Sequence, residues 1–578
     1  MLLGAWFGLL VGFVEVGHET IRERVFGSVL HHKSADFVWM TPVSYLVMGL
    51  ATGFLLGVIA RFAPRVVTVR VAAFALASLG AWSQLLAYPS LHGAAVLALA
   101  LGVAWQCSRS WALGCARTLG WARRSTRWML MVVVAAAAVA TIRRPVAEQL
   151  EMASLPAAPA GAKNVVLIVL DTVRADHLST YGYRRKTSPN LDALSLGGVT
   201  FENCLSTSPW TLPAHVTMFT GRYQHEIDAD WLKPFGDRYP TLAEAMAARG
   251  YATGGFVGNL GYCGRQNGID RGFHRYEDFY VQLDVLVFSS LVGQRVGRWL
   301  LGDAFGTALR NDAETVTTRF LGWTRELEGR PFFAFLNYYD AHETYLPPEE
   351  FDRFDPNDDP GSRYGLDEKP EVTRRFAADY DGCIAYIDHQ LGRLIAELDA
   401  AGTLDETVLI VTGDHGEMFF EQGLHGHGHS LYRPLVQVPL VMWSKGGVPK
   451  RRRIKDWVTI SDLPATVFEL SGVAPDGAFP GQSLSQFWRP AGPAEERSPL
   501  LAEVSQGIAM PSFTPVSGGD MKSLIEGSLQ FITGGNRGDA LYDLIKDPRQ
   551  EINMIDSAPG RRAAARMRAT IQRIVGDN

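Results

Sequence analysis

The stretch NVVLIVLD, residues 164–171, is a continuous run of aliphatic, mostly β-branched residues that ends at a carboxylate, Asp171. A strand that is buried on both faces of a parallel sheet has this pattern. In open sheets with helices on both faces, ligands bind beyond the carboxyl ends of the strands. The segment therefore predicts a central strand that delivers Asp171 to a ligand site.

The same pattern recurs downstream. The segment 240–259 (PTLAEAMAARGYATGGFVGN) predicts a helix, a glycine stop and a strand, 330–342 (RPFFAFLNYYDAH) predicts a strand ending at Asp340 and His342, and 405–417 (DETVLIVTGDHGE) predicts one ending at Asp414 and His415. Helices alternate with apolar strands, so we expect an α/β fold with a mostly parallel sheet flanked by helices.

The acids and the histidine at these strand ends suggest a metal site. Asp171, Asp414 and His415 offer oxygen ligands and an imidazole to one divalent cation, with Ca²⁺, Mn²⁺ and Zn²⁺ all compatible. In SPWTLPAHVTMFTG, residues 208–221, Thr211 opens an apolar helical stretch. Its hydroxyl is either a helix cap or a nucleophile beside the metal.

The first 150 residues differ sharply from the rest. Of 55 Lys and Arg and 60 Asp and Glu in the chain, they hold 13 and 5, which leaves 42 and 55 for the remainder. The acidic remainder has no basic stripe that would favour nucleic acid. Five apolar runs predict a transmembrane domain of about five helices over 1–145, followed by a linker over 146–162. The runs are 2–18, 39–61, 68–88, 92–107 and 128–142.

Basic residues indicate the orientation of these helices. Arg61, Arg65 and Arg70 flank the second connection, and five arginines lie between the fourth and fifth runs. The positive-inside rule then puts the amino terminus inside and the chain after residue 145 on the extracytoplasmic side. Near the end of the first run, Glu15 and His18 either line a polar site or form an interfacial pair.

Several ordered motifs after the linker resemble the sulfatase family of the alkaline-phosphatase superfamily. They are NVVLIVLDTVRADHLSTYGY (164–183), TSPNLDALSLGGVTFENCLSTSPWTLPAHVTMFTGRYQHE (187–226), GDHGEMFFEQGLHGHGHSLYRPLVQVPLVM (413–442) and three closing segments, DLPATVFELSGV, PGQSL and LYDLIKDPRQEINMI. The resemblance covers 163–556 as a catalytic domain and leaves 557–578 as a helical tail. It implies a metal-dependent ester hydrolase or transferase.

By this resemblance Asp171, Asp414 and His415 bind one metal ion, and Thr211 is a further ligand and the nucleophile. His342 contacts the anionic oxygens or protonates the leaving group. His427 is the next candidate for these roles, and His429 could fill them equally well. Arg174 and His215 are the other expected substrate contacts, although a salt bridge is an equal alternative for Arg174.

The nucleophile departs from the family's pattern. Sulfatases carry Cys or Ser in a Cys/Ser-x-Pro-x-Arg motif that is oxidised to formylglycine, whereas this chain has Thr211, Pro213 and His215 at those positions. Threonine cannot give that aldehyde, because its β-carbon bears a methyl group. The resemblance therefore favours cleavage or transfer of phosphoesters through phospho-Thr211, with sulfuric ester hydrolysis as the alternative and an inactive binding module as a second one.

Two expectations concern partners. Membrane anchoring suits a lipid or glycan head group as the substrate, because it raises the local concentration of such groups, and it equally suits a soluble ester. The apolar segment 280–312 is either an amphipathic element on the lipid bilayer or a helical lid.

Overall fold

The computed structural model divides the chain into two compact units. One comprises 1–150 and 279–309, and the other comprises 151–278 and 310–578. The structure describes residues 1–576 apart from 27–35, 89, 113–114, 228, 232, 279–285, 287–288, 303–309, 359–369, 475–476, 490–497 and 508–509.

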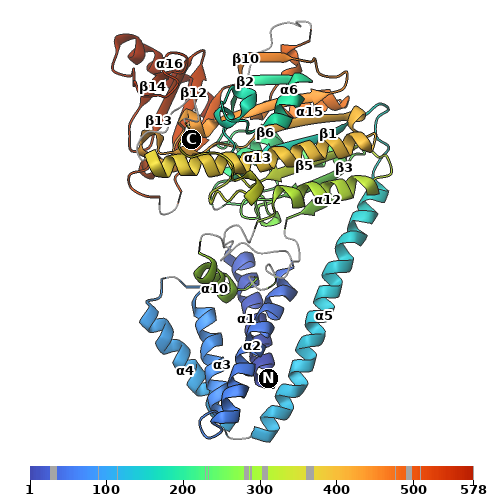
Figure 1. The fold of residues 1–578 in the computed structure, drawn as a ribbon, viewed down its shortest axis with the longest axis vertical. Helices are drawn as coiled ribbons and strands as arrows, with labels where there is room; N and C mark the ends of the chain where they lie inside the picture. Colours follow the sequence, from blue (N-terminus) through green and yellow to red (C-terminus); the bar gives the residue numbers. More distant parts are fainter. Residues whose placement is uncertain are drawn as a thin grey trace. The chain divides into compact units, whose positions relative to one another are not determined.

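The first unit is helical (Figure 1). Its helices within the described ranges are α1 (Leu2–Phe26), α2 (Phe37–Phe62), α3 (Val69–Leu85), α4 (Gly93–Ala112), α5 (Cys115–Ser154, whose last turn belongs to the second unit) and α10 (Leu291–Leu301). Each of the first five contains all or most of one predicted apolar run, and α5 continues to Ser154, into the predicted linker 146–162. In the described part of the chain, Leu2–Arg22, Phe37–Phe62 and Arg117–Ser154 are long and apolar enough to cross a membrane, and α3 and α4 contain shorter apolar helices.

Close packing of α1 on α2 depends on glycine. A Cβ atom added to Gly8 would lie 2.3 Å from the carbonyl oxygen of Tyr45, and one added to Gly49 would lie 2.2 Å from that of Gly4. Small residues let the two backbones approach to contact, as is common between helices in lipid.

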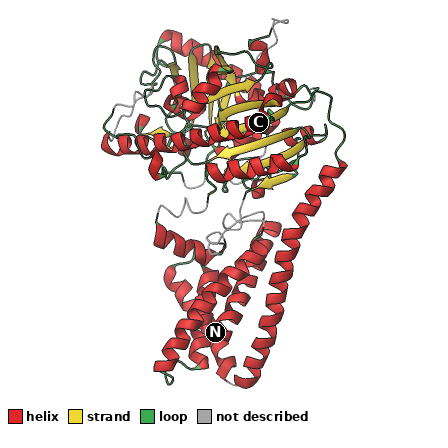
Figure 2. Cartoon of the chain, turned by 45° about the vertical axis from the view of Figure 1, so that its right-hand side comes forward, coloured by secondary structure: helices red, strands yellow, loops and turns green. Residues whose placement is uncertain are grey.

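The second unit is built on an eight-stranded mixed sheet, which Figure 2 shows between helices. The strand order is β10-β2-β9-β6-β1-β5-β3-β4, and β9 alone runs antiparallel to its neighbours. The bounds are β1 (Asn164–Leu170), β2 (Val199–Leu205), β3 (Ala252–Val257), β4 (Arg275–Glu277), β5 (Phe332–Tyr338), β6 (Thr407–Gly413), β9 (Gln437–Ser444) and β10 (Arg452–Thr459). This confirms the predicted α/β fold with a mostly parallel sheet.

Helices cover both faces of this sheet and form two hydrophobic cores with it. The core on one face contains side chains of α7 (Thr211–Thr220), α8 (Leu242–Ala247) and α15 (Leu463–Ser471). The core on the other face contains side chains of α6 (Pro189–Leu196), α12 (Ala313–Glu326) and α13 (Pro370–Ala400). Burial on both faces explains why β1, β5 and β6 read as continuous apolar runs.

The chain ends in a second, antiparallel sheet with the order β11-β12-β13-β14. Its strands are β11 (Leu501–Val504), β12 (Met521–Glu526), β13 (Leu529–Gly534) and β14 (Ala540–Asp543). The predicted helical tail forms α16 (Ala558–Val575), and its buried Met567 and Ile571 share a core with Leu524 and Phe531 of this sheet.

The segment 279–309 differs from the sequence-based division. Sequence motifs placed it inside the catalytic domain, whereas in the structure it belongs to the helical unit. Of the predicted element 280–312, residues 280–285, 287–288 and 303–309 lie outside the described residues.

Candidate metal centre and nucleophile

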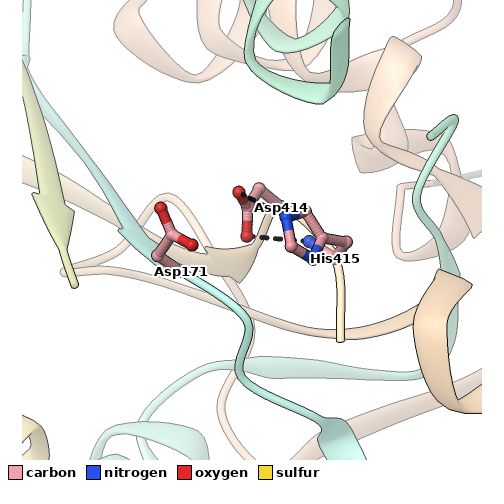
Figure 3. A group of neighbouring side chains, drawn as sticks. All are labelled: Asp171, Asp414 and His415. Atoms are coloured by element: carbon pink, nitrogen blue, oxygen red, sulfur yellow. Dashed lines mark hydrogen bonds and ion pairs between the residues drawn. The ribbon is translucent and has the colours of Figure 1, made fainter. Parts of the chain in front are cut away.

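Three potential metal ligands follow adjacent strands. In the register of the sheet, Leu170 of β1 pairs with Gly413 of β6, so the residues that follow them, Asp171 and Asp414, lie side by side. His415 follows directly. One ligand atom from each of Asp171, Asp414 and His415 lies within 4.8 Å of the others, and all three residues are fully buried (Figure 3). The structure thus brings the three predicted metal ligands together.

Each carboxylate has one oxygen held by the protein and one that is not. Asn259 and Asn337 donate to Asp171 Oδ2 at 2.9 and 3.1 Å. The backbone amides of Thr172 and His415 donate to Asp414 Oδ1 at 3.1 and 2.8 Å. In the described part of the chain, Asp171 Oδ1 and Asp414 Oδ2 are buried without a hydrogen bond. Buried oxygens without a donor are costly, and a cation between them would remove that cost.

The charges at this site fit a divalent cation. Burial, and then the neighbouring Asp414, raise the pKa of Asp171 to about 8, and burial raises the pKa of Asp414 to about 7. Two buried carboxylates side by side disfavour the ionised form, and a bound cation would reverse that balance.

His415 presents a lone pair to the same place. Its Nδ1 lies 2.9 Å from the carbonyl oxygen of Gly416, which can only accept, so Nδ1 carries the proton. Burial lowers the pKa of His415, which favours the neutral ring. The remaining nitrogen, Nε2, is then unprotonated, the form in which histidine binds metals.

Thr211 lies beside these ligands. It is the first residue of α7, it is 1% exposed, and its hydroxyl oxygen lies 3.2 Å from His415 Nε2. The amino terminus of this ten-residue helix presents free backbone N–H groups, which favour an anionic ligand. The structure therefore places the predicted nucleophile next to the predicted metal ligands.

His215 holds the nucleophile's own backbone. Its Nδ1 donates to the carbonyl oxygen of Thr211, one turn earlier in α7, at 2.8 Å, and lies 3.7 Å from Asp414 Oδ2. Burial lowers its pKa to about 4, so the ring is neutral. Neutral histidine at this position does not replace the charge of the arginine in the family's motif.

Two further predicted histidines gather beside the metal ligands. The ring of His427 lies 4.6 Å from that of His415 and 4.9 Å from that of His342. His427 Nδ1 is 2.9 Å from Glu417 Oε1, whereas His342 Nδ1 donates to the carbonyl oxygen of Glu343 at 2.7 Å. In both rings Nδ1 is hydrogen-bonded to the protein, so Nε2 is the nitrogen that can contact a substrate or transfer a proton.

The remaining predicted contacts are engaged with other protein groups. Arg174 is fully buried and forms ion pairs with Asp176 and Glu421, so the structure describes the salt-bridge alternative. His429 uses both ring nitrogens within its own loop, on Ser430 Oγ and the carbonyl oxygen of His425. Asp340, the acid after β5, accepts from the backbone amide of Ala313 at the start of α12.

Sequence reasoning missed three residues that hold the site: Asn259, Asn337 and Glu417. Asn259 closely follows β3 and could have been found by the strand-end rule that identified Asp171. Asn337 lies within β5 and Glu417 three residues beyond Asp414, and nothing in the local sequence distinguishes their roles.

Comparison with known proteins agrees with this geometry. A family model described as Sulfatase matches residues 163–473, more than half of the chain. A multifunctional alkaline phosphatase superfamily protein of Trinickia caryophylli is 27% identical over 424 residues, covering 59% of this chain and 80% of its own. An arylsulfatase of Clostridium perfringens is 24% identical over 454 residues, covering 68% of this chain and 90% of its own.

Solved structures share the fold. The phosphonate monoester hydrolase of Agrobacterium radiobacter superposes with a TM-score of 0.57 at 21% identity, over 71% of this chain and 94% of its own. At this level of identity the likeness establishes the architecture of the second unit. It does not identify the substrate.

Proposed function

The chain belongs to the sulfatase family and is an ester hydrolase of that family, and on this basis we propose that it cleaves or transfers phosphoesters with Thr211 as the nucleophile. The observation that carries the proposal is the Thr211 hydroxyl, 3.2 Å from Nε2 of His415 at the amino terminus of α7. Because threonine cannot be converted to formylglycine, the hydroxyl itself is the nucleophile.

We assign Asp171, Asp414, His415 and Thr211 to one divalent metal ion. Asp171 Oδ1 and Asp414 Oδ2, which are buried without a hydrogen bond in the described part of the chain, and the unprotonated Nε2 of His415 support this donor set. Ca²⁺, Mn²⁺ and Zn²⁺ all accept such ligands. When bound, the metal supplies Lewis-acid stabilisation of an alkoxide and of the charge on the transferred group.

The Thr211 hydroxyl loses its proton to solvent before the first step. That step forms the bond between Thr211 Oγ1 and phosphorus and breaks the bond between phosphorus and the leaving oxygen, which receives a proton. His427 is the proposed proton donor, with Glu417 holding its Nδ1. In the free protein, burial lowers the pKa of His427 well below its usual range. The negative phosphate of the substrate favours the imidazolium that this step requires.

The second step returns Thr211. Water, or an acceptor hydroxyl, attacks phospho-Thr211, the bond to Oγ1 breaks, and the neutral His427 takes the attacker's proton. His342, whose ring lies against that of His427, is proposed to contact the substrate in both steps. We expect His342→Ala to lose turnover and to bind product phosphate more weakly; lost turnover with normal phosphate binding would instead assign His342 to the leaving group.

We further propose that α1 to α5 anchor the enzyme in a membrane, with the catalytic unit on the extracytoplasmic side. The three long apolar helices and the arginines of the connections support this topology. A lipid or glycan head group in the same envelope is the proposed substrate class. The alternatives are sulfuric ester hydrolysis and an inactive binding module, the latter opposed by the complete set of proposed ligands.

Trapping of the intermediate tests the chemistry. Full-length protein turning over a phosphodiester is quenched in acid and digested, and its peptides are examined by mass spectrometry. We expect phosphate on Thr211 and none on the same peptide of the Thr211→Ala variant. Phosphate on another residue, or a sulfated Thr211 formed faster from a sulfate ester, would overturn the proposal.

A further inference from the structure

The helix α10 belongs to the helical unit although the chain on both sides of it belongs to the catalytic unit. Three polar contacts hold its start. Thr41 Oγ1 donates to the carbonyl oxygen of Ser289 at 2.9 Å, the hydroxyls of Ser44 and Ser290 lie 2.9 Å apart, and the amide of Leu291 donates to Glu15 Oε1 at 3.0 Å. The segment that carries α10 is thus an integral part of the helical unit.

Glu15 joins four helices. This side chain of α1 is 1% exposed, and its Oε2 accepts from the hydroxyl of Tyr45 in α2 at 2.5 Å and from Gln84 in α3 at 3.4 Å. Its Oε1 meets the first amide of α10, whose N-cap Ser290 accepts from Gly293. A carboxylate at the amino terminus of a helix satisfies a free N–H and interacts favourably with the helix dipole. Of the two interpretations of Glu15, the structure describes the polar site.

These contacts place α10 at one end of the bundle. Thr41 and Ser44 lie in the first two turns of α2, where the chain has just left α1. Asp36, directly before α2, forms an ion pair with Arg144 of α5. Arg144 lies six residues before residue 150, where the chain leaves the helical unit. If α1, α2 and α5 span a membrane, this end of the bundle is where they meet its surface.

The exposed surface of α10 is amphipathic. Val292, Val296 and Trp299 follow the i, i+4, i+7 spacing of one helix face, and Leu300 lies beside them. Trp299 is 82%, Leu300 65% and Val296 41% exposed. Val292 is half-buried, and Gly293 and Gly297 are buried.

Basic residues accompany this apolar face. Arg295 and Arg298 are exposed, and α10 contains no acidic residue. Tryptophan and arginine beside an apolar face are typical of helices that lie in the membrane interface, where the basic groups contact lipid phosphates.

We propose that α10 is an interfacial membrane helix. Val292, Val296, Trp299 and Leu300 insert between the lipids of the leaflet in which α1 ends, Arg295 and Arg298 contact the phosphates of anionic lipids, and Glu15 fixes the helix to the bundle. The inference rests on the proposed membrane insertion of the helical unit. Of the two alternatives for the segment 280–312, the inference favours an amphipathic element on the lipid bilayer over a helical lid.

The test measures depth with a spin label in the full-length protein, reconstituted in vesicles of phosphatidylcholine and phosphatidylglycerol. In a background with Cys107 and Cys115 replaced by Ala, one label is attached at Trp299→Cys. Val134→Cys in α5 and Ile545→Cys in the catalytic unit are matched controls, because these side chains are 67% and 80% exposed. The readout is the ratio of collision rates with oxygen, which enters lipid, and with a water-soluble nickel chelate.

We expect ratios several-fold higher at 299 and 134 than at 545. A high ratio at 134 with a low one at 299 would overturn the inference and leave membrane anchoring intact. Low ratios at both positions would overturn both. We expect the ratio at 299 to rise with the fraction of phosphatidylglycerol in the vesicles. In the charge-reversed variant, Arg295→Glu with Arg298→Glu, this dependence should be lost. An unchanged dependence would exclude the arginines as the lipid contacts.

Discussion

At the scale of single residues, Thr211 combines two properties that fit its proposed role as the nucleophile. Its hydroxyl lies next to His415 Nε2, and its β-carbon carries a methyl group that prevents oxidation to an aldehyde. Its own carbonyl oxygen is held by His215, which fixes the start of α7. The nucleophile is therefore positioned from both its side chain and its backbone.

Replacement of Thr211 separates the nucleophile from the fold. Thr211→Ala is expected to lower kcat by about 10⁴-fold or more, because the covalent route is lost, while Asp171, Asp414 and His415 still retain metal. Thr211→Ser is expected to keep measurable turnover, since its hydroxyl occupies the same place. Steady-state kinetics with metal analysis checks both. A Thr211→Ala enzyme as active as the parent would contradict the assignment.

Glu417 is expected to act through His427. Glu417→Gln should lower kcat by about 10²-fold for a substrate with a poor leaving group, within the range of general acid catalysis, and far less for an activated aryl ester. A double variant with His427→Ala should be no worse than His427→Ala alone, because the two residues act as a unit. Additive losses, or equal losses for both leaving groups, would indicate a merely structural role for Glu417.

At the scale of elements, the order of strands assembles the site. β3, β5, β1 and β6 are consecutive neighbours, so Asn259, Asn337, Asp171 and Asp414 come together at one edge although they are far apart in the sequence. The two amides from β3 and β5 fix Asp171 from the side opposite to Asp414 and leave Oδ1 for a ligand.

Loss of one of these amides should weaken metal binding. Asn259→Ala is expected to lower metal affinity by about 10- to 100-fold, as is usual when a group that orients a ligand is removed. Asn203→Ala is the matched control, because Asn203 lies in β2 of the same sheet, donates to the carbonyl oxygen of Lys455 and accepts from Gln437, neither of which is a proposed metal ligand. Competition with a metal-binding dye measures both affinities, and equal affinities would contradict the role of Asn259.

The strands, and the acids that follow them, were predictable from sequence because each signal is local. β1, β5 and β6 are buried on both faces, so their residues are mostly apolar, and Asp171, Asp340 and Asp414 follow them closely. The role of Asn337 depends on the register between β5 and β1, which no local pattern encodes. The attachment of α10 to Glu15 joins residues 276 positions apart, and it too was beyond local patterns.

At the scale of the whole molecule, a metal ion is expected to change how stability depends on pH. Without metal, the pKa values of Asp171 and Asp414, about 8 and about 7, lie above those of the unfolded chain. The native state then binds more protons than the unfolded state, so the free energy of unfolding falls as pH rises from about 4 to about 8.

Bound metal should reverse this sign at the two carboxylates, because it holds them ionised and their stabilising contribution is then lost as pH falls. Thermal unfolding of the full chain in detergent, with chelator and with metal, over this pH range checks the prediction. Stability curves that run parallel with and without metal would contradict a site at Asp171 and Asp414.

The two units suggest how the enzyme finds its substrate. If α1 to α5 span a membrane and α10 lies in its interface, as proposed, the catalytic unit is retained at the lipid surface at more than one point of its sequence. Retention raises the concentration of envelope head groups around the enzyme without any added affinity at the site.

The central claim is phosphoryl chemistry by an unmodified threonine. The most direct test is kcat/KM of the metal-loaded full-length enzyme on a phosphodiester, a phosphomonoester and a sulfate ester that share one aryl leaving group, with Thr211→Ala as the blank. The account predicts a clear preference for a phosphoester that vanishes in the blank. A preference for the sulfate ester would contradict it, because an unmodified threonine would then serve a sulfatase.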